Sequence, residues 1–408
     1  MNILFVTDHR VTPRSGGIER VVGALGGAMT ERLGWTVRYA CIDATEPGES
    51  AFDFRQSNVA YRLETDLNHE EVDCVIDELM VGENVRRYVP EIDLACRKSG
   101  VSHVYSYHMM PGYELADGRD LDFVWYALRR GHNVRHNLVR LGMTLWTRLF
   151  GQGRFMGRMQ EKYGVAYGYA DVVVLESERY VEDYLRMCGG ENRERVVAML
   201  NPLPYDEDVA EKLRLTEKKK RVMLVARMEE DQKRVWLALK VWKEVVRHDD
   251  LKDWTLTMIG EGTDWDLYRR RAEETGLERV EFVGNQALDN YYAQSAILMM
   301  TSAYEGLPMV LLEAQQTGVV PIAFDSFASV HEVITDGENG VLARNNDVAG
   351  YASALVGLMR DREKRKQMAE QARETCRRFG MGEIVRQWDR LLQDVRKKRE
   401  ENGNGGRE

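Results

Sequence analysis

The chain has few of the residues that build disulfide-linked or zinc-bound folds. Among 408 residues there are five cysteines, scattered, odd in number and without C-x-x-C spacing: Cys41, Cys74, Cys96, Cys188 and Cys376. Such a set suits a reducing compartment and offers no zinc site. No uninterrupted apolar run reaches the roughly 18–20 residues that a membrane-spanning helix needs. The first residues lack the charged region of a signal peptide, so we expect a cytoplasmic protein.

Positively charged residues are fewer than negatively charged ones. The 57 lysines and arginines are outnumbered by 66 aspartates and glutamates, and the net charge of -9 argues against general nucleic-acid binding. The G-x-G-x-x-G fingerprint is missing, and no acidic residue stands in the expected ribose position, so a nicotinamide dehydrogenase is the least favoured enzyme. With 44% hydrophobic and 30% charged residues, the chain is long enough for two ordinary globular domains.

The most informative stretch is 301–318, which reads TSAYEGLPMVLLEAQQTG. An apolar run precedes it, and a segment of helical composition follows its Gly-Leu-Pro turn, where Pro308 suits the first helical turn. A helix N-terminus of this kind favours an anion, typically phosphate. Glu305 and Glu313 bracket the turn, where carboxylates suit hydrogen bonds from sugar hydroxyls. A simpler interpretation makes Glu305 a helix cap and Glu313 a solvated residue.

The pattern E-G-x-P-x-x-x-x-E, followed by A-x-x-x-G, resembles the signature of retaining nucleotide-sugar glycosyltransferases of family 4. Members of that family build bacterial polysaccharides and lipid-linked saccharides. The resemblance implies an α/β protein of the GT-B class, with two facing Rossmann-like domains, parallel sheets and a C-terminal helix that crosses back to the first domain. It also implies that Glu305 orients the sugar and Glu313 the ribose. The donor would contact the turn itself at Gly306, Leu307, Pro308, Met309 and Val310.

Arg227 and Lys233 flank the loop after another strand-like run. An arginine fork and a lysine point charge suit a diphosphate, although such charges are also common on solvated surfaces. Compared with the family pattern G-R-x-x-x-x-K-G, these two residues occupy the diphosphate-binding positions, with one more residue between them. The sequence departs from the pattern at Ala226, which replaces the first glycine, and at Arg234, which replaces the last.

Further donor contacts follow from the resemblance. The first loop, S-G-G-I-E-R-V, resembles a glycine turn that approaches the donor phosphates; taken alone, a simple loop explains it as well. A strand ending in G-x-G and the turn after the next strand resemble the segments that approach the nucleotide and its base. The residues concerned are Gly16, Gly17, Gly260, Gly262 and Asn285.

His108 follows the predicted strand 101–107. The carboxyl end of a parallel strand faces the crevice where open α/β sheets bind ligands, whereas His103, inside the strand, is expected to be packed. By default His108 is a loop histidine with a backbone partner. The resemblance implies that it lies beside the transferred sugar and supports departure of the diphosphate.

The segment Asp120-Leu121-Asp122 has the D-x-D pattern that binds a divalent metal in the other major glycosyltransferase fold. Here the two aspartates precede an amphipathic segment and are more typical of charges at a helix N-terminus. We therefore predict no metal site and no cofactor; the nucleotide sugar is a co-substrate.

The stretch 125–162 alternates arginines with large apolar residues, and Glu161 is its only acid. A basic amphipathic segment in an acidic protein is typical of contact with an anionic membrane surface. Alternatively, the arginines extend over an ordinary helical core layer. The first interpretation predicts peripheral association with the inner face of the plasma membrane.

Two prolines in the segment 201–204, NPLP, mark a linker. We predict an N-terminal acceptor-side domain (1–200) that includes the basic insert 125–162. A donor-binding domain (201–380), a crossover helix (381–395) and a disordered tail (396–408) follow.

The resulting functional prediction is a retaining enzyme that transfers a hexose or N-acetylhexosamine from a UDP-sugar to a saccharide or lipid-linked acceptor. One alternative keeps the fold and changes the acceptor to phosphate, water or a sugar phosphate. Another is a non-catalytic nucleotide-sugar-binding or scaffold protein.

Overall fold

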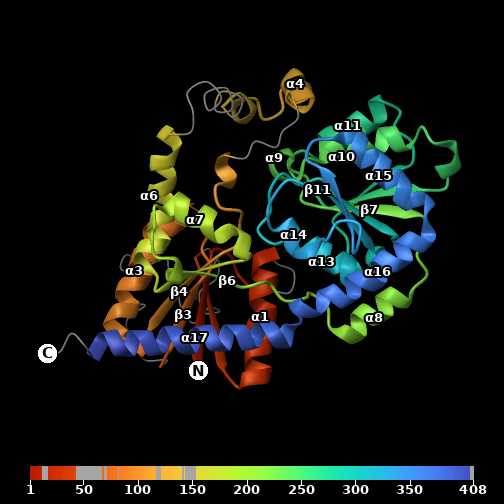
Figure 1. Ribbon diagram of the computed structural model, residues 1–408. Coiled ribbons are helices and arrows are strands. Elements are labelled where there is room, and N and C mark those ends of the chain that lie inside the picture. Colours follow the sequence, from red (N-terminus) through yellow and green to blue (C-terminus); the bar gives the residue numbers. More distant parts are fainter. Residues whose placement is uncertain are drawn as a thin grey trace. The chain divides into compact units, whose positions relative to one another are not determined.

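The computed structural model describes residues 1–11, 17–42, 67–68, 71–80, 82–115, 121–139, 142 and 153–404. The chain forms two compact units. Unit 1 comprises Met1–Gly112, Gly153–Pro202 and Phe379–Glu408, and unit 2 comprises Tyr113–Gln152 and Leu203–Arg378. Each unit is built on one six-stranded parallel sheet (Figure 1). The predicted α/β class with two Rossmann-like domains is therefore confirmed.

The sheet of unit 1 has the strand order β2-β1-β3-β4-β5-β6. The apolar runs at residues 3–6 and 172–175 lie in this sheet, as expected where helices cover both faces of a parallel sheet. The strands are β1 (Asn2–Thr7), β2 (Thr36–Cys41), β3 (Cys74–Asp77), β4 (Ser102–Tyr107), β5 (Val172–Leu175) and β6 (Val196–Ala198). The helices are α1 (Gly17–Leu33), α3 (Gly82–Ser99), α6 (Gly153–Tyr169), α7 (Val181–Cys188) and α17 (Met381–Asn404), with 3-10 turns η2 (Glu178–Tyr180) and η3 (Arg193–Arg195).

Helix α17 returns the end of the chain to unit 1, as the predicted crossover helix requires. It lies beside α1, and its Trp388 and Leu392 are buried in the core of this unit (Figure 1). The predicted disorder from residue 396 onward is wrong for the described part, which stays helical to Asn404. Arg396 pairs with Asp73 at 3.1 Å, and Arg399 pairs with Asp171. These ion pairs give the charged end of the helix partners that its composition does not reveal.

The sheet of unit 2 has the order β12-β11-β10-β7-β8-β9. Its strands are β7 (Arg221–Val225), β8 (Thr255–Ile259), β9 (Val280–Gly284), β10 (Ile297–Met300), β11 (Val320–Asp325) and β12 (Val341–Arg344). The helices are α4 (Leu121–Arg129), α8 (Glu207–Leu215), α9 (Glu230–Lys233), α10 (Val235–Val245), α11 (Trp265–Glu274), α12 (Asp289–Gln294), α13 (Met309–Gln316), α14 (Val330–Val333), α15 (Val348–Arg360) and α16 (Arg362–Cys376), with 3-10 turns η1 (Tyr113–Leu115), η4 (Asp249–Leu251) and η5 (Arg377–Phe379).

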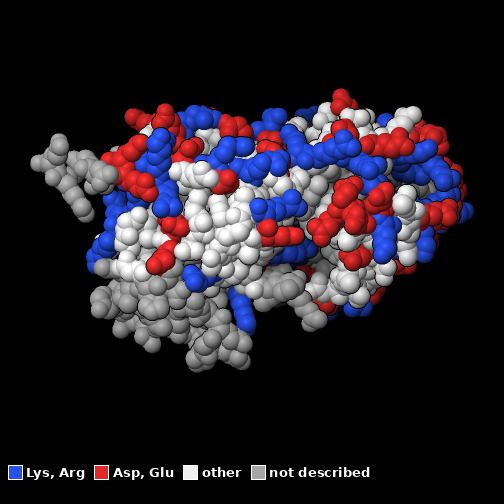
Figure 2. Space-filling view, turned by 90° about the horizontal axis from the view of Figure 1, so that it is seen from below, with Lys and Arg blue, Asp and Glu red and all other residues white. Residues whose placement is uncertain are grey.

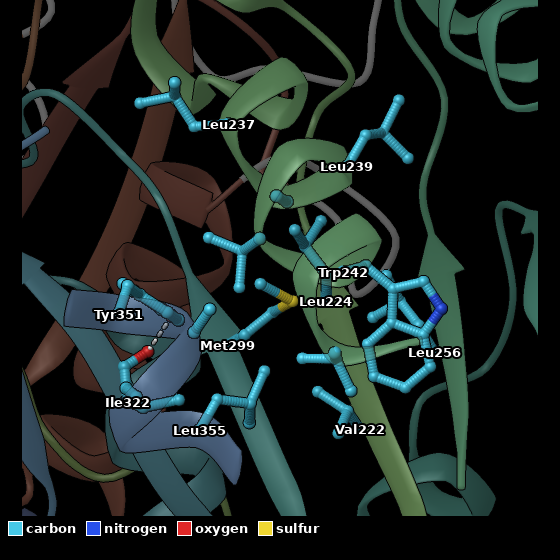
Figure 3. Close-up of a cluster of buried hydrophobic side chains, with 14 of the residues drawn as sticks. Val222, Leu224, Leu237, Leu239, Trp242, Leu256, Met299, Ile322, Tyr351 and Leu355 are labelled. Atoms are coloured by element: carbon cyan, nitrogen blue, oxygen red, sulfur yellow. Dashed lines mark hydrogen bonds between the residues drawn. The ribbon is translucent and has the colours of Figure 1, made fainter. Parts of the chain in front are cut away.

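Apolar side chains of the strands pack against α10 and α15 to form the core of unit 2 (Figure 3). Trp242 of α10 is fully buried there, and its indole N–H donates to the carbonyl of Glu278 at 3.0 Å. Tyr351 of α15 donates its hydroxyl to the carbonyl of Ile322 at 2.7 Å. Both buried polar groups are thus satisfied, which removes the cost of burying them.

Helix α4 belongs to unit 2, although the sequence analysis assigned residues 125–162 to the first domain. Phe123 of α4 is 1% exposed, and its ring lies 5.5 Å from that of Trp236 and 6.0 Å from that of Tyr268. The segment from Gly153 onward lies in unit 1 as α6. The predicted insert is therefore divided between the units, because buried apolar contacts place α4 in the second core.

Candidate active site

The loops that carry most of the predicted site residues meet at one edge of the sheet in unit 2. Strands β10, β7 and β8 are parallel neighbours, so the segments that follow their carboxyl ends lie side by side. Arg227 follows β7, Gly260 follows β8 and Glu305 follows β10. This is the edge at which open parallel sheets bind ligands.

A chain of polar contacts joins the first and last of these loops. Lys233 donates its ammonium to Oε1 of Glu305 at 2.6 Å, and Gln232 donates its amide to Oε2 of the same carboxylate at 3.0 Å. Arg227 donates to Oε1 of Gln232 at 3.2 Å and pairs with Glu229 at 2.9 Å. The structure thus brings together Arg227, Lys233 and Glu305. Sequence reasoning missed Gln232, which bridges them.

The buried side chain of Arg234 also links these two loops by hydrogen bonds. It is 1% exposed and donates to the carbonyls of Thr301 at 2.6 Å and Ser302 at 2.7 Å. It also donates to the side chains of Asn345 and Asn346, each at 2.8 Å. Burial lowers the pKa of its guanidinium to about 10.

The backbone of Arg234 is left-handed, with a φ of 47°. Glycine adopts that conformation most easily, which gives a physical reason for the glycine that the resemblance expected at this position. In this chain an arginine accepts the backbone strain. Its four hydrogen bonds to the β10 loop and the Asn345–Asn346 turn offset that cost.

Gly260 and Gly262 allow the loop after β8 to approach the loop after β7. Gly260 has a φ of 123°, and a Cβ there would overlap the carbonyl oxygen of Ala226. A Cβ on Gly262 would lie 2.6 Å from the carbonyl oxygen of Met228. Close packing of two backbones therefore explains both glycines in this structure, and their contact with a nucleotide stays a prediction. Asn285 is exposed beyond the end of β9.

The segment of Gly306, Leu307 and Pro308 leads into α13, which begins at Met309 and continues through Val310. Pro308 is the N-cap, one position before the predicted first turn. The first N–H groups of any helix have no partner within it. Glu313 is not a solvated face residue, because it is 1% exposed and accepts a 2.5 Å hydrogen bond from the hydroxyl of Tyr292.

His108 lies in unit 1, within a second polar cluster. Because β3, β4 and β5 are adjacent parallel strands, the residues that follow them, Glu78, His108 and Glu176, come to one edge of the sheet. Nδ1 of His108 lies 2.9 Å from Oε1 of Glu176, and Nε2 contacts Glu78. Burial acts to lower the pKa of His108, but the two carboxylates outweigh it and raise the pKa well above its ordinary value.

The histidine and its partners line a cavity of about 10 Å³, together with Asn201 and Trp388. That volume is close to what a single water molecule needs. His103 is fully buried, as expected, between Asp77 and Asp93. Of the glycines predicted in the first loop, Gly17 opens α1, and Gly16 lies outside the described residues.

The D-x-D segment is described only in part. Asp122 is in the first turn of α4 and pairs with Lys240 at 2.7 Å, which lowers the pKa of the carboxyl group. Asp120 lies outside the described residues. Within the described part of the chain, no group of three or more metal-ligating side chains is placed to hold an ion. The metal-free site stays a prediction.

Comparison with known proteins finds a family match within the second unit. Residues 206–375 match the family described as "Glycosyl transferases group 1". The chain is 28% identical over 234 residues to the amylovoran biosynthesis glycosyltransferase AmsD of Erwinia amylovora, covering 55% of this chain and 63% of AmsD. It is 30% identical over 234 residues to an exopolysaccharide phosphotransferase of Streptomyces coelicolor, covering 57% of this chain and 24% of that protein. Both matches therefore span less than two thirds of the relative.

The solved structures extend the likeness to the whole fold. HepE of Anabaena, in complex with UDP-glucose, superposes with a TM-score of 0.69 at 16% identity, over 97% of this chain and 100% of HepE. The predicted GT-B class is confirmed. Within the described residues, no helix is both long and apolar enough to cross a membrane.

Proposed function

We propose, from the premise that residues 206–375 form a glycosyl transferases group 1 domain, that the chain is a retaining glycosyltransferase that uses a UDP-sugar. The observation that carries the proposal is the polar chain from Arg227 through Gln232 to Glu305 and Lys233, placed beside the start of α13. It combines two cations, a carboxylate and a helix N-terminus at the ligand-binding edge of a parallel sheet.

The chemistry follows from where charge develops. Breaking the bond between the anomeric carbon and the diphosphate oxygen leaves negative charge on the leaving group, while the sugar becomes oxocarbenium-like. Arg227, Lys233 and the α13 N-terminus stabilise the diphosphate without a metal. Glu305 then accepts hydrogen bonds from the sugar and Glu313 from the ribose. The resemblance also gives His108 of unit 1, whose pKa Glu78 and Glu176 raise, a role in the departure of the diphosphate.

The relatives support the proposed donor and acceptor class. HepE was solved with UDP-glucose, and AmsD is named for amylovoran biosynthesis. A hexose or N-acetylhexosamine moved to a saccharide or lipid-linked saccharide in surface polysaccharide synthesis agrees with both. Product NMR tests retention, because an α-linked donor must then give an α-linked product; a β-linked product would exclude a retaining mechanism.

A thermal-stability panel of UDP-, GDP-, ADP- and dTDP-sugars, with a metal chelator present, tests the donor site. A ligand at a hundred times its Kd adds about 2.7 kcal/mol of stability. We expect a shift with UDP-sugars that disappears in Arg227→Ala. The matched control is Arg247→Ala, which removes an arginine that pairs with Glu244 on α10. No shift with any nucleotide sugar would favour the scaffold alternative.

Peripheral membrane contact is the second part of the proposal, and the surface of α4 and the helical segment 134–139 supports it. Trp125 is 62% exposed, Leu138 52% and Val139 54%, while Arg129 and Arg135 are also exposed. Apolar and basic side chains on one segment are the two contributions to binding an anionic bilayer surface. Of the predicted stretch 125–162, residues 140–141 and 143–152 lie outside the described residues.

Co-sedimentation with vesicles that contain an anionic lipid tests this contact. We expect binding at low salt that weakens in the double variant Trp125→Ser with Leu138→Ser. The control is Leu94→Ser on α3, which removes an apolar side chain that is 48% exposed in unit 1. Equal binding by all three proteins, or no binding at low salt, would contradict the proposal.

A further inference from the structure

A large pocket lies at the end of the sheet in unit 2 that is opposite the candidate active site. Its volume is about 940 Å³, within the range of small-molecule sites. It is lined by Lys220 just before β7, Ala296 just before β10 and Val320 at the start of β11. The pocket thus faces the amino ends of strands whose carboxyl ends lead to Arg227 and Glu305. The five residues of β7 separate the two ends by about 16 Å.

The pocket is strongly basic, although the chain carries a net charge of -9. Eight of its lining residues are lysine or arginine, and two are glutamate. Four of the cations, Arg362, Arg365, Lys366 and Arg373, follow helical spacing along α16, so they lie on one face of that helix. Figure 2 looks at the molecule from below, the side of α8 and α16 in Figure 1, and shows groups of blue lysine and arginine side chains on this face.

Part of this charge has no acidic partner in the described structure. Lys220 pairs with Asp253, and Arg373 lies 3.7 Å from Glu207. Lys219 and Lys366 are exposed in the pocket and form no ion pair or side-chain hydrogen bond with any described residue. Arg362, at the start of α16, likewise has no carboxylate within ion-pair distance among the described residues. Such cations are available to an incoming anion.

The inner cations are held rigidly. Lys218 donates to the carbonyls of Thr317 at 2.7 Å, Tyr292 at 2.8 Å and Leu213 at 3.3 Å. Burial and the neighbouring Arg214 lower the pKa of Lys218 to about 7. Burial and Arg362 likewise lower the pKa of Arg365. Lys218 and Arg214 therefore repel each other, as do Arg365 and Arg362, and a bound anion would relieve that repulsion.

We propose that this pocket is a second ligand site, which binds a phosphate group independently of the donor site. Its apolar part, from Leu215, Ala296, Val320 and Ala369, suits an organic group that carries the phosphate. Lysine ammonium and arginine guanidinium are the usual partners of phosphate oxygens. A free phosphorylated compound and the head group of an anionic lipid share this chemistry. The inference does not depend on the transferase activity.

Lysine footprinting locates the binding directly. The protein is acetylated briefly with and without inorganic pyrophosphate, and the labelling of each lysine is read by mass spectrometry. We expect pyrophosphate to slow acetylation of Lys219 and Lys366 but not of Lys243, an exposed lysine on α10 that belongs to neither site. Protection of Lys233 reports donor-site binding separately. Equal labelling of Lys219 and Lys366 with and without pyrophosphate would overturn the proposal.

A calorimetric titration supplies the affinity. The variant Lys219→Gln with Arg362→Gln and Lys366→Gln removes three cations that make no ion pair among the described residues, so folding should persist. We expect about tenfold weaker pyrophosphate binding at this site, since each exposed charge contributes modestly. The control removes the same charge elsewhere, with Lys243→Gln, Arg270→Gln and Lys398→Gln. Equal weakening by both variants would show general screening and contradict a built site.

Vesicles distinguish the two phosphate sources. With phosphatidylglycerol vesicles in place of pyrophosphate, protection of Lys219 and Lys366 that is absent with phosphatidylcholine vesicles identifies a lipid head group. Protection by pyrophosphate without protection by either vesicle identifies a free phosphorylated compound. Protection by neither probe overturns the proposal.

Discussion

Lys233 and Glu305 form a 2.6 Å ion pair that joins the loop after β7 to the loop after β10. The lysine is 20% exposed and the glutamate 12%, so the pair is only partly screened by solvent. Backbone bonds reinforce it, since Ala303 donates to the carbonyl of Gln232 at 2.7 Å and Thr301 donates its hydroxyl to the carbonyl of Lys233 at 2.8 Å. Contacts with the loop after β10 therefore position Lys233, and contacts with the loop after β7 position Glu305.

Lys233→Met should lower kcat by roughly two or three orders of magnitude, because it removes a charge that stabilises the diphosphate leaving group. The matched control is Lys252→Met, which removes a lysine from an exposed ion pair with Asp249. Steady-state kinetics with a UDP-sugar donor measure both. If Lys233→Met retained full kcat while the fold stayed intact, the assigned role of Lys233 would be wrong.

Arg234 provides a stability prediction that separates backbone strain from side-chain bonding. Arg234→Gly and Arg234→Ala both leave the carbonyl of Thr301 without its side-chain donor, at a cost of about 1–3 kcal/mol, whereas the carbonyl of Ser302 keeps the 2.6 Å hydrogen bond from the hydroxyl of Ser326. Alanine also keeps the left-handed strain, about 1–2 kcal/mol, which glycine relieves. Urea unfolding should therefore rank the wild type above Gly, and Gly above Ala.

The same variants should weaken donor binding, since the loop that carries Glu305 loses its anchor. Arg279→Gly is the control, because Arg279 also has a positive φ, of 58°, but precedes β9 away from these loops. Equal stability of the Gly and Ala variants would show that the backbone at residue 234 is not strained. Unchanged donor affinity would show that the side chain of Arg234 does not anchor the loop that carries Glu305.

His108 makes stability depend on pH. Its pKa in the folded protein is raised well above the ordinary value by Glu78 and Glu176, so the folded state holds a proton that the unfolded state releases near pH 6.5. The contribution of His108 to the free energy of unfolding is complete below about pH 6.5. Above that pH it declines by about 1.4 kcal/mol per pH unit, and it is lost once the pH passes the pKa of His108 in the folded protein.

The comparison of wild type with His108→Gln isolates this effect. The variant leaves the buried carboxylates of Glu78 and Glu176 without their cation, a change that costs about 3–5 kcal/mol where the histidine is charged. We expect the difference in unfolding free energy to shrink as the pH rises from 6.5 to 9. A difference that is constant over that range would mean that His108 is neutral in the fold.

The parts of the fold that follow from local pattern were predictable from the sequence. Each of these elements can be recognised from a few neighbouring residues: the apolar runs of β1, β7 and β10, and the turn before α13. The residues after those strands could be assigned to one edge because parallel strands share their direction. The family pattern also located Arg227, Lys233 and Glu305 before any contact between them was known.

What could not be predicted depends on contacts between distant segments. Glu78 and Glu176 flank His108 only because β3 and β5 are the neighbours of β4. The order of strands in a sheet cannot be predicted from the local amino-acid composition. In the sequence, Arg234 is recognisable only as a departure from the family pattern. Its burial and its hydrogen bonds to the loop after β10 depend on the fold. The charged end of α17 resembled a disordered tail until its partners, Asp73 and Asp171, were known.

The placement of α4 in unit 2 is the most directly testable of these long-range contacts. Phe123 is 1% exposed and packs on Trp236 of α10 and Tyr268 of α11, so Phe123→Ala should cost about 3–5 kcal/mol. Amide hydrogen exchange should then accelerate in α10 and α11 and stay unchanged in α1 and α17 of unit 1. Trp125→Ala, on the exposed side of the same helix, is the control and should leave all four helices unaffected. Faster exchange in α1 and α17, with α10 unchanged, would return the segment to the first domain, as the sequence alone had predicted.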